Sequence, residues 1–317
     1  MSADHRLPGL LCLLAAVVLG GCGVGPGKGA DGDVRLTVTR DFGAREVVAV
    51  DKAQTEGSDT VMRVLQRNVD NVATRFGGGF VHEINGVAGG RRDGRRVDWF
   101  IYVNGIQSEE GATGLDVHGG DRIWWDHHDW GATPDIPAVV GSFPEPFLHG
   151  TEGRRLPVRV ECSAPESPPC DAVAGKLTKL GIVAGRSNLA RSPGDETLRV
   201  LVGPWNRLRA RDIEADNIDS GPRSSGVFAR FAGSGERLVV LDERGRAART
   251  LGAGTGLVAA TKAEERQPVW YITGTDDAGV ASAARAFDES VLSDRFALAI
   301  SDDLPVRVPL TEEAPTP

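Results

Sequence analysis

The residues best suited to chemistry in this sequence lie together at Trp124–Trp130, in the order Trp-Trp-Asp-His-His-Asp-Trp. Aromatic faces and imidazoles at the end of a strand can stack on a flat ligand or hold a cation. Two histidines between two aspartates can also bind a divalent metal. The third alternative is a core tryptophan followed by a polar loop that packs against a second domain. The small-molecule hypothesis, with no bound metal, involves Trp124, Trp125, His127, His128 and Trp130.

No catalytic signature is present in the sequence. It has no Gly-x-Ser-x-Gly elbow, no His-Glu-x-x-His and no phosphate loop ending in Gly-Lys-Ser/Thr. Asp276 and Asp277 follow a predicted strand, where the ligands of open α/β sheets bind, but capping of the next helix also explains them. The arginines within residues 91–96 could meet an anion or form a solvated hairpin tip. We therefore expect a protein that is not an enzyme.

The first residues predict export from the cytoplasm. Arg6 precedes the apolar stretch Leu10–Leu19, which at about ten residues is half the length that a membrane-spanning helix needs. Small residues and a cysteine follow, and this order is typical of a secretory signal peptide with a cleavage site. The motif Leu19-Gly20-Gly21-Cys22 resembles the lipobox of bacterial lipoproteins. The alternative is an ordinary signal peptide with Cys22 removed or unmodified.

The lipobox resemblance implies cleavage before Cys22 and attachment of a diacylglycerol, with acyl chains such as palmitate, to its thiol. Residues 1–21 would be the signal peptide, and residues 22–33 a flexible tether with too little apolar surface to fold. The protein would then be lipid-anchored on the extracytoplasmic face of a bacterial cell membrane. In that oxidising environment Cys162 and Cys170 are expected to form a disulfide, with metal binding by the two cysteines as the alternative.

Composition limits the class of protein further. The chain has 317 residues, of which 40% are hydrophobic and 25% charged, as in globular proteins with room for two domains. Its formal net charge of -8 argues against nucleic acid as a partner, because nucleic-acid binding needs a basic face. The same charge disfavours electrostatic attachment to anionic lipid, so the membrane anchor must be the acyl chains.

Hydrophobic periodicity in the first half predicts strands around a single helix. Ser58 and Asp59 are placed to cap a helix whose apolar face begins at Val61. Alternation along the last strand would place Trp124 and Trp125 on opposite faces, so one of them is expected in the core. The predicted strands are 34–38, 46–50, 80–84, 98–103 and 122–126. This arrangement indicates a compact α+β domain.

Three linked motifs in this half resemble the DUF4430 family: Phe80-Val-His-Glu-Ile-Asn-Gly86, Trp99-Phe-Ile-Tyr-Val-Asn-Gly105 and Gly119-Gly-Asp-Arg-Ile-Trp124. The resemblance implies a β-grasp-like domain over residues 34–130, related to the carboxy-terminal domain of the cobalamin carriers transcobalamin and intrinsic factor. It also implies a cobalamin-like ligand and adds Trp99, Tyr102 and Asn104 to the predicted ligand-binding residues. The motifs mainly encode turns and core, because Asn-Gly supplies the positive φ of tight hairpins. The carriers' helical barrel has no counterpart in this sequence, so their full binding mode does not carry over.

The second half predicts a layered α/β domain. Residues 131–155 are rich in proline and glycine and form a connector whose apolar side chains need something to pack on. From residue 156 to residue 310, apolar strands alternate with helices that Asp171 and Asp276-Asp277 would cap. This order favours a largely parallel sheet. The expected fold class is therefore α+β, an N-terminal β-grasp-like domain followed by a layered α/β domain.

Together these features favour an extracytoplasmic binding protein. We expect the two domains to form a cleft that captures a small molecule, cobalamin-like by the family resemblance, for a vitamin-type membrane transporter. No resident cofactor is expected. The alternative is a cell-envelope scaffold that binds another protein or a wall polymer without catalysis. A large apolar cleft would favour the first function, and a flat exposed aromatic patch would favour the second.

Overall fold

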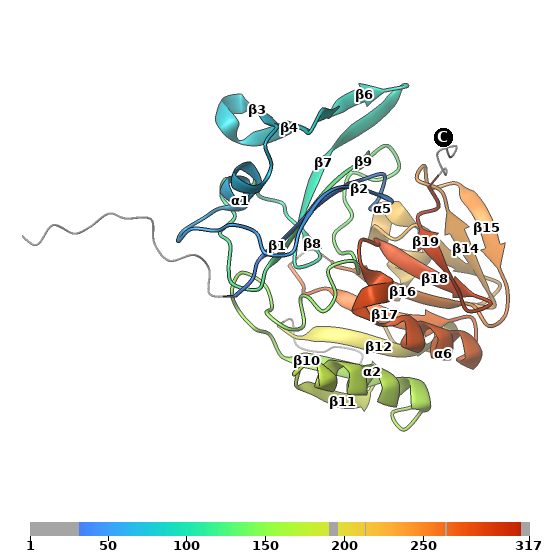
Figure 1. The fold of residues 1–317 in the computed structure, drawn as a ribbon. Helices are drawn as coiled ribbons and strands as arrows, with labels where there is room; N and C mark the ends of the chain where they lie inside the picture. The colour runs from blue at the N-terminus through green and yellow to red at the C-terminus, as the bar shows by residue number, and fades with distance from the viewer. Residues whose placement is uncertain (1–31, 190–195, 213, 264, 312–317) are drawn as a thin grey trace, which may run out of the picture.

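The structure is a computed structural model that describes residues 32–189, 196–212, 214–263 and 265–311 (Figure 1). The predicted signal peptide, the lipid-attachment residue Cys22 and nearly all of the tether lie outside the described residues. The mixture of helices and several sheets is the α+β class that the sequence predicts. None of the helices in these ranges is both long and apolar enough to cross a membrane.

The N-terminal part is built on one sheet with a helix at its side. Its elements are β1 (Arg35–Arg40), β2 (Arg45–Val50), α1 (Val61–Asn68), β3 (Val72–Arg75), η1 (Phe76–Gly78), β4 (Phe80–Ile84), β5 (Val87–Ala88), β6 (Gly90–Arg92), β7 (Arg95–Val103), β8 (Ile106–Gln107) and β9 (Arg122–Asp129). The main sheet has the order β2-β1-β9-β7-β6, with β8 paired to β7, and β3, β4 and β5 form a small sheet of their own. β1 and β9 run parallel in the middle, flanked by antiparallel β2 and β7. A sheet whose first and last strands run parallel at its centre has the arrangement of a β-grasp.

Helix α1 is capped by Thr60, not by Ser58 or Asp59 as the sequence pattern predicts. The Thr60 hydroxyl accepts the Arg63 N–H at 3.5 Å. Asp59 is instead buried in an ion pair with Arg67. The apolar face of the helix packs on the sheet through Val61, Met62, Val64 and Leu65.

Strand β9 is longer than predicted, and this changes the environment of the two histidines. The prediction ends the strand at Asp126, whereas β9 pairs with β7 as far as Asp129 opposite Val97. His127 and His128 are therefore strand residues that face opposite sides of the sheet. They are 1% and 2% exposed, so the polar loop expected here does not form.

The C-terminal part is built on a seven-stranded mixed sheet. Its strands are β10 (Val158–Cys162), β11 (Ala184–Asn188), β12 (Leu198–Pro204), β16 (Gly256–Thr261), β17 (Val269–Gly274), β18 (Ala297–Ser301) and β19 (Leu304–Val308), in the order β11-β10-β12-β17-β16-β18-β19. β11, β10, β12 and β17 are parallel, whereas β16, β18 and β19 join antiparallel. The largely parallel sheet of the prediction is therefore correct for four strands only. Short links such as the turn Asp302-Asp303 cannot make a parallel crossover, which needs a dozen or more residues.

Helices cover both faces of this sheet. On one face lie α2 (Pro168–Lys179) and α6 (Asp277–Ala286), in the lower part of Figure 1, with the short α7 (Glu289–Leu292) nearby. The other face carries α3 (Trp205–Arg209), α4 (Ala215–Asp219), α5 (Pro222–Ser225) and a small sheet of β13 (Ala229–Ala232), β14 (Arg237–Leu241) and β15 (Ala247–Leu251). The side chains of β12 alternate between these two covered faces, which is why the strand is buried along its whole length.

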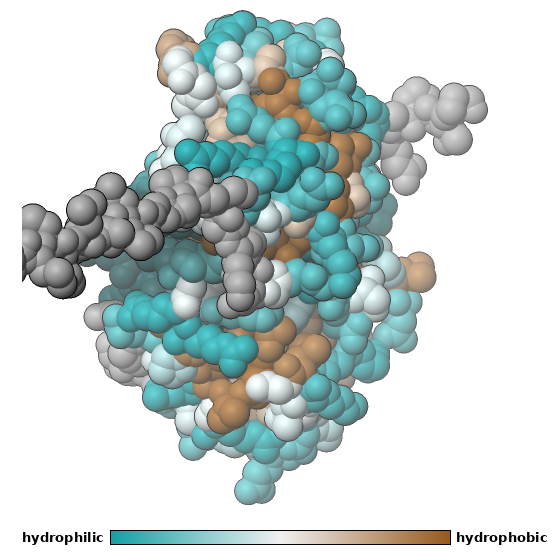
Figure 2. Space-filling model, turned by 60° about the vertical axis from the view of Figure 1, so that its left-hand side comes forward, coloured by the Kyte–Doolittle hydropathy of each residue, from teal (hydrophilic) through white to brown (hydrophobic). Residues whose placement is uncertain are grey.

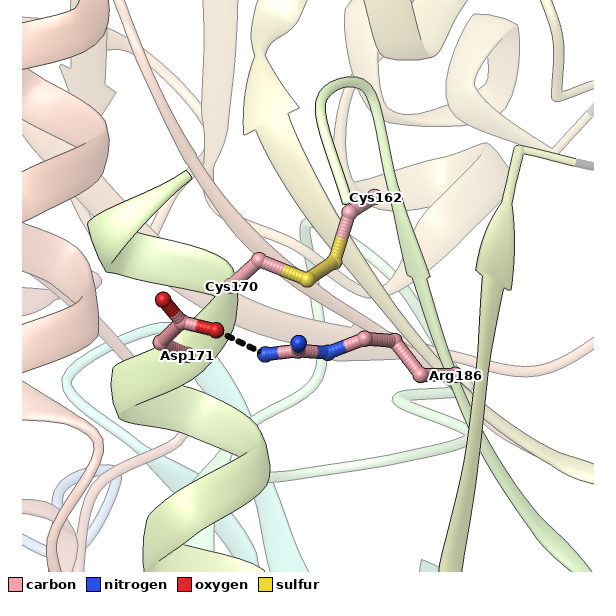
Figure 3. Close-up of a disulfide and its surroundings, with 4 residues drawn as sticks. All are labelled: Cys162, Cys170, Asp171 and Arg186. Carbon is pink, nitrogen blue, oxygen red and sulfur yellow. Dashed lines mark hydrogen bonds and ion pairs between the residues drawn. A yellow bond between two sulfur atoms is a disulfide. The ribbon is translucent and has the colours of Figure 1, made fainter. Parts of the chain in front are cut away.

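The predicted disulfide is present and joins the end of β10 to the first turn of α2 (Figure 3). Helix α2 begins earlier than predicted, with Ser167 as N-cap and prolines in its first turn, where their missing N–H groups need no partner. Asp171 lies inside that turn and pairs with Arg186 of β11 rather than capping the helix. The disulfide and the ion pair together tie α2 to both strands that it connects.

The connector 131–155 is packed, as its apolar residues predict. Val139, Val140, Phe143 and Phe147 are at most 4% exposed. Phe147 contacts Trp270 of β17 with ring centroids 5.0 Å apart. The connector therefore forms part of the C-terminal core instead of a free linker.

Candidate functional site

Three of the predicted binding residues lie in the contact between the two main sheets. The rings of Trp124, Tyr102 and His128 reach Phe296, directly before β18, with centroid distances of 5.2, 5.5 and 5.5 Å. Each of the three is at most 2% exposed. Burial raises the pKa of the Tyr102 hydroxyl well above its ordinary value, so this group stays neutral. These contacts are those of the alternative interpretation, in which the aromatic cluster packs against a second domain.

A buried carboxylate orders the N-terminal side of this contact. Asp126 accepts hydrogen bonds from the Thr39 hydroxyl at 2.5 Å, from His128 Nδ1 at 2.8 Å and from two backbone N–H groups of residues 42–43 at 3.2 and 2.9 Å. Trp124 Nε1 in turn donates to Thr39 Oγ1 at 2.7 Å. A buried charge is tolerated when donors surround it, so the arrangement is that of a structural anchor.

Other predicted residues face the core around α1. Trp99 and Trp125 belong to that core, and alternation thus separates Trp124 from Trp125 as predicted, although both are buried. His127 lies beside Trp99 with ring centroids 5.0 Å apart, and its Nε2 is 3.1 Å from the Ala88 carbonyl oxygen. Burial lowers the pKa of the His127 imidazole, which favours its neutral form.

Asn104 and Trp130 have local partners. Asn104 adopts a φ of 53° in its turn, and its side chain bonds Asp121, Arg122 and Gly150 at 2.8 to 2.9 Å. These bonds use its amide to fix the turn and the connector. Trp130 is half-buried, with the Arg96 guanidinium 4.1 Å from its ring centroid.

His127 and His128 do not form a metal site, because they face opposite sides of β9. Within the part of the chain that the structure describes, no three His, Cys, Asp or Glu side chains are arranged to hold a metal ion. His128 Nδ1 is already engaged by Asp126.

An aromatic cavity of about 220 Å³ opens beside Trp99 and Trp125. Phe80 also lines it and is 37% exposed, next to Phe76 at 87% exposed. Figure 2 shows apolar residues exposed in both the upper and the lower half of this face, among hydrophilic ones. Trp125 Nε1 is buried without an acceptor among the described residues. The remaining lining residues are Gly79, Val81, Phe100, Ile101, Ser108, Glu109, Glu110, Gly111 and Ala112.

A larger polar cavity of about 770 Å³ lies between the two halves of the chain, and we refer to it as the interdomain cleft. Glu109 and Gln107 line it from the N-terminal part, and Arg223 and Lys262 line it from the C-terminal part. Glu109 lines the aromatic cavity as well, so the two cavities adjoin at this residue. The other lining residues of the cleft are Asp135, Pro137, Asn217, Ser224, Gly226, Ala263 and Glu265.

The two adjoining cavities thus contain two of the predicted binding residues, together with residues that no sequence pattern predicts. Trp99 and Trp125 remain, whereas Trp124, Tyr102 and His128 are enclosed in the contact between the sheets. The cleft residues, most of them polar, come from separate segments of the chain, at 107–109, at 135–137 and at 217–265. No local pattern marks them. The charged pair Glu109-Glu110 after β8 is the only local hint, and it resembles any solvated loop.

Comparison with known proteins identifies one part of the chain. Residues 58–129 match the family described as a domain of unknown function, DUF4430. The resemblance that the three motifs predict is therefore confirmed for residues 58–129, and the aromatic cavity lies entirely within them. No curated protein matches the chain. A solved structure from Ruminococcus gnavus, described as a candidate metal-binding protein, shares 18% identity at a TM-score of 0.25, over 31% of this chain and 98% of that one.

Proposed function

We propose that this protein is a lipid-anchored extracytoplasmic binding protein that captures a small molecule for a membrane transporter and performs no catalysis. The observation that carries the proposal is the pair of cavities that adjoin at Glu109, one polar and one aromatic. The cleft, at about 770 Å³, falls within the roughly 300–1,000 Å³ typical of small-molecule sites. The motif that ends at Cys22 supports export and anchoring.

The lining of the two cavities favours a ligand with a polar body and a ring. Arg223 and Lys262 line the cleft and have no hydrogen-bond or ion-pair partner among the described residues. Glu109 and Asp135 supply carboxylates to the same cleft, with a charge opposite to that of Arg223 and Lys262. The aromatic cavity, at about 220 Å³, holds a ring-sized group but not a whole corrin. A cobalamin-like ligand would therefore lie mainly across the cleft and insert only one edge.

One observation favours a second function, that of an envelope scaffold. Phe76 and Phe80 form an exposed aromatic pair with ring centroids 6.2 Å apart at the tip between β3 and β4. Exposed aromatic residues of this kind are common where a protein contacts another macromolecule. In that case the pair, not the cleft, would carry binding.

Native mass spectrometry of the protein purified from its own source tests the binding function. We expect a stoichiometric extra mass that is lost in Glu109→Gln and in Arg223→Gln, because each removes a charged contact in the cleft. Arg230→Gln is the matched control, since Arg230 is an exposed arginine of β13 outside the cleft. Thermal shift with cyanocobalamin tests the cobalamin-like ligand directly.

The outcomes separate the two functions. A purified protein with no extra mass, and with no thermal shift by cyanocobalamin, would contradict capture in the cleft. Retention of a macromolecular partner that is lost in Phe76→Ala but kept in Glu109→Gln would support the scaffold. Loss of ligand in Arg230→Gln as well would mean that general charge, not the cleft, holds it.

A further inference from the structure

A further cavity lies at the carboxyl ends of the parallel strands of the C-terminal sheet. Its volume is about 440 Å³, and it is separate from the two cavities that adjoin at Glu109. Cys162 ends β10 and Asn188 ends β11, and Asn206 follows β12. The full lining is Cys162, Ser163, Asn188, Leu189, Asn206, Arg207, Ala210 and Arg211.

The chain reverses its strand order at this cavity. From β10 it passes through α2 to β11 on one side, whereas the next strand, β12, lies on the other side of β10. The segment after β10 enters α2 on one face of the sheet, and the segment after β12 enters α3 on the opposite face. Such diverging segments leave a crevice beyond the strand ends, which is where open α/β sheets bind their ligands.

The charge of the cavity is opposite to that of the protein. Arg207 and Arg211 line it without any carboxylate, although the chain has a formal net charge of -8. Among the described residues, neither guanidinium group has a hydrogen-bond or ion-pair partner. Arg209, between them, differs because it pairs with Asp216 and Asp219 at 3.0 and 3.2 Å. Only the two arginines that face the cavity are available to a ligand.

The walls of the cavity are held in place. Helix α3 is anchored by Trp205 and Leu208, which are 1% and 0% exposed. On the opposite wall, the Cys162–Cys170 disulfide fixes the end of β10 (Figure 3), and the Ser163 N–H bonds the Val202 carbonyl at 2.9 Å. A site that is ordered before binding loses less entropy when it takes a ligand.

We infer that this cavity binds a small anionic molecule through an oxyanion group, a phosphate or a carboxylate. Arg207 and Arg211 contact the oxyanion, since guanidinium groups match the planar and bidentate geometry of these anions. The amides of Asn188 and Asn206 and the hydroxyl of Ser163 bond the uncharged polar groups of the same ligand. The site is independent of the cleft, so the protein carries a second small-molecule site.

Isothermal titration calorimetry of the purified protein tests this site, with inorganic phosphate, adenosine monophosphate and succinate as probes. We expect saturable binding of at least one probe, weakened roughly tenfold or more by Arg207→Gln and by Arg211→Gln, because each removes a charge-assisted hydrogen bond. Arg209→Gln is the matched control, with the same charge change on the same helix outside the cavity. Preference for phosphate and adenosine monophosphate over succinate would identify a phosphorylated ligand, and the reverse a carboxylate.

Two results would overturn the inference. One is the absence of saturable heat with all three probes at millimolar concentration. The other is equal weakening by Arg209→Gln, which would show a diffuse charge effect rather than a site. Glu109→Gln, which empties the cleft, should leave binding of these probes unchanged, so failure of one site is distinguishable from failure of the other.

Discussion

The hydrogen bond from Trp124 to Thr39 gives the sharpest test of the buried, fixed orientation of Trp124 in the aromatic cluster. Trp124→Phe removes the indole N–H that Thr39 accepts at 2.7 Å. Trp125→Phe is the matched control, because both tryptophans are 2% exposed and Trp125 Nε1 has no acceptor among the described residues. The two variants remove the same volume from adjacent positions of one strand, and they differ in this bond.

The size of the difference follows from the net worth of one buried hydrogen bond. A neutral pair contributes about 0.5–1.5 kcal/mol to the free energy of unfolding, so Trp124→Phe should cost about 1 kcal/mol more than Trp125→Phe. The two cores relax differently around the lost volume, so a double-mutant cycle with Thr39→Val isolates the pair. Its coupling energy should lie in the same range, about 0.5–1.5 kcal/mol.

Equilibrium urea unfolding, followed by circular dichroism, measures both quantities. A coupling energy within error of zero would refute the hydrogen bond between Trp124 and Thr39. Retained stability together with lost ligand in Trp124→Phe would return Trp124 to the binding site. If Trp124 is an interface residue, ligand retention in native mass spectrometry should match that of the wild type.

Three further predictions follow from particular contacts. The Cys162→Ser, Cys170→Ser double variant should lower the free energy of unfolding by about 2–3 kcal/mol, the chain-entropy estimate for so short a loop, as measured by urea unfolding; an unchanged midpoint would contradict it. Asp276→Ala should cost about 1–2 kcal/mol in the same assay, because Asp276 caps α6 through the Gly279 N–H at 2.8 Å; an unchanged stability would exclude the cap. The lowered pKa of His127 means that the unfolded chain binds its proton first, so stability should fall as the pH drops below about 6.5; His127→Gln should flatten that slope in unfolding curves from pH 5 to pH 8, and an unaltered slope would contradict the assignment.

Local patterns in the sequence predicted much of the fold because they depend on neighbours along the chain. Strand Phe80–Ile84 matches its predicted bounds, and the Asp276 cap is correct because a side chain needs only the next turn to satisfy it. The cap of α1 was misplaced because Ser58, Asp59 and Thr60 all suit that role. Which of them caps depends on the ion pair that buries Asp59, and that pair is not a local pattern.

The surroundings of the predicted site depend on residues that lie outside the segment itself. The polar residues after Asp126 predict a loop. The strand continues instead, because its partner β7 begins at Arg95 and pairs with β9 as far as Asp129. The aromatic side chains then meet Phe296, which is about 170 positions away in the sequence. Alternation along the strand predicts that Trp124 and Trp125 lie on opposite faces of the sheet. It does not predict that each face is covered by another part of the chain.

The core shared by the two main sheets limits how far the two halves of the chain can move apart. The donors to Asp126 all belong to the N-terminal sheet and its β1–β2 turn, so those hydrogen bonds do not join the two halves. Phe42, Tyr102 and Trp124 share one core with the C-terminal sheet, however, so separation would expose apolar surface to water, which is unfavourable. Ligand capture by wide hinge opening is therefore disfavoured in this chain. If the interdomain cleft binds a ligand as proposed, the ligand would enter by movements of the rim of the cleft, where Glu109, Arg223 and Lys262 lie outside the shared core.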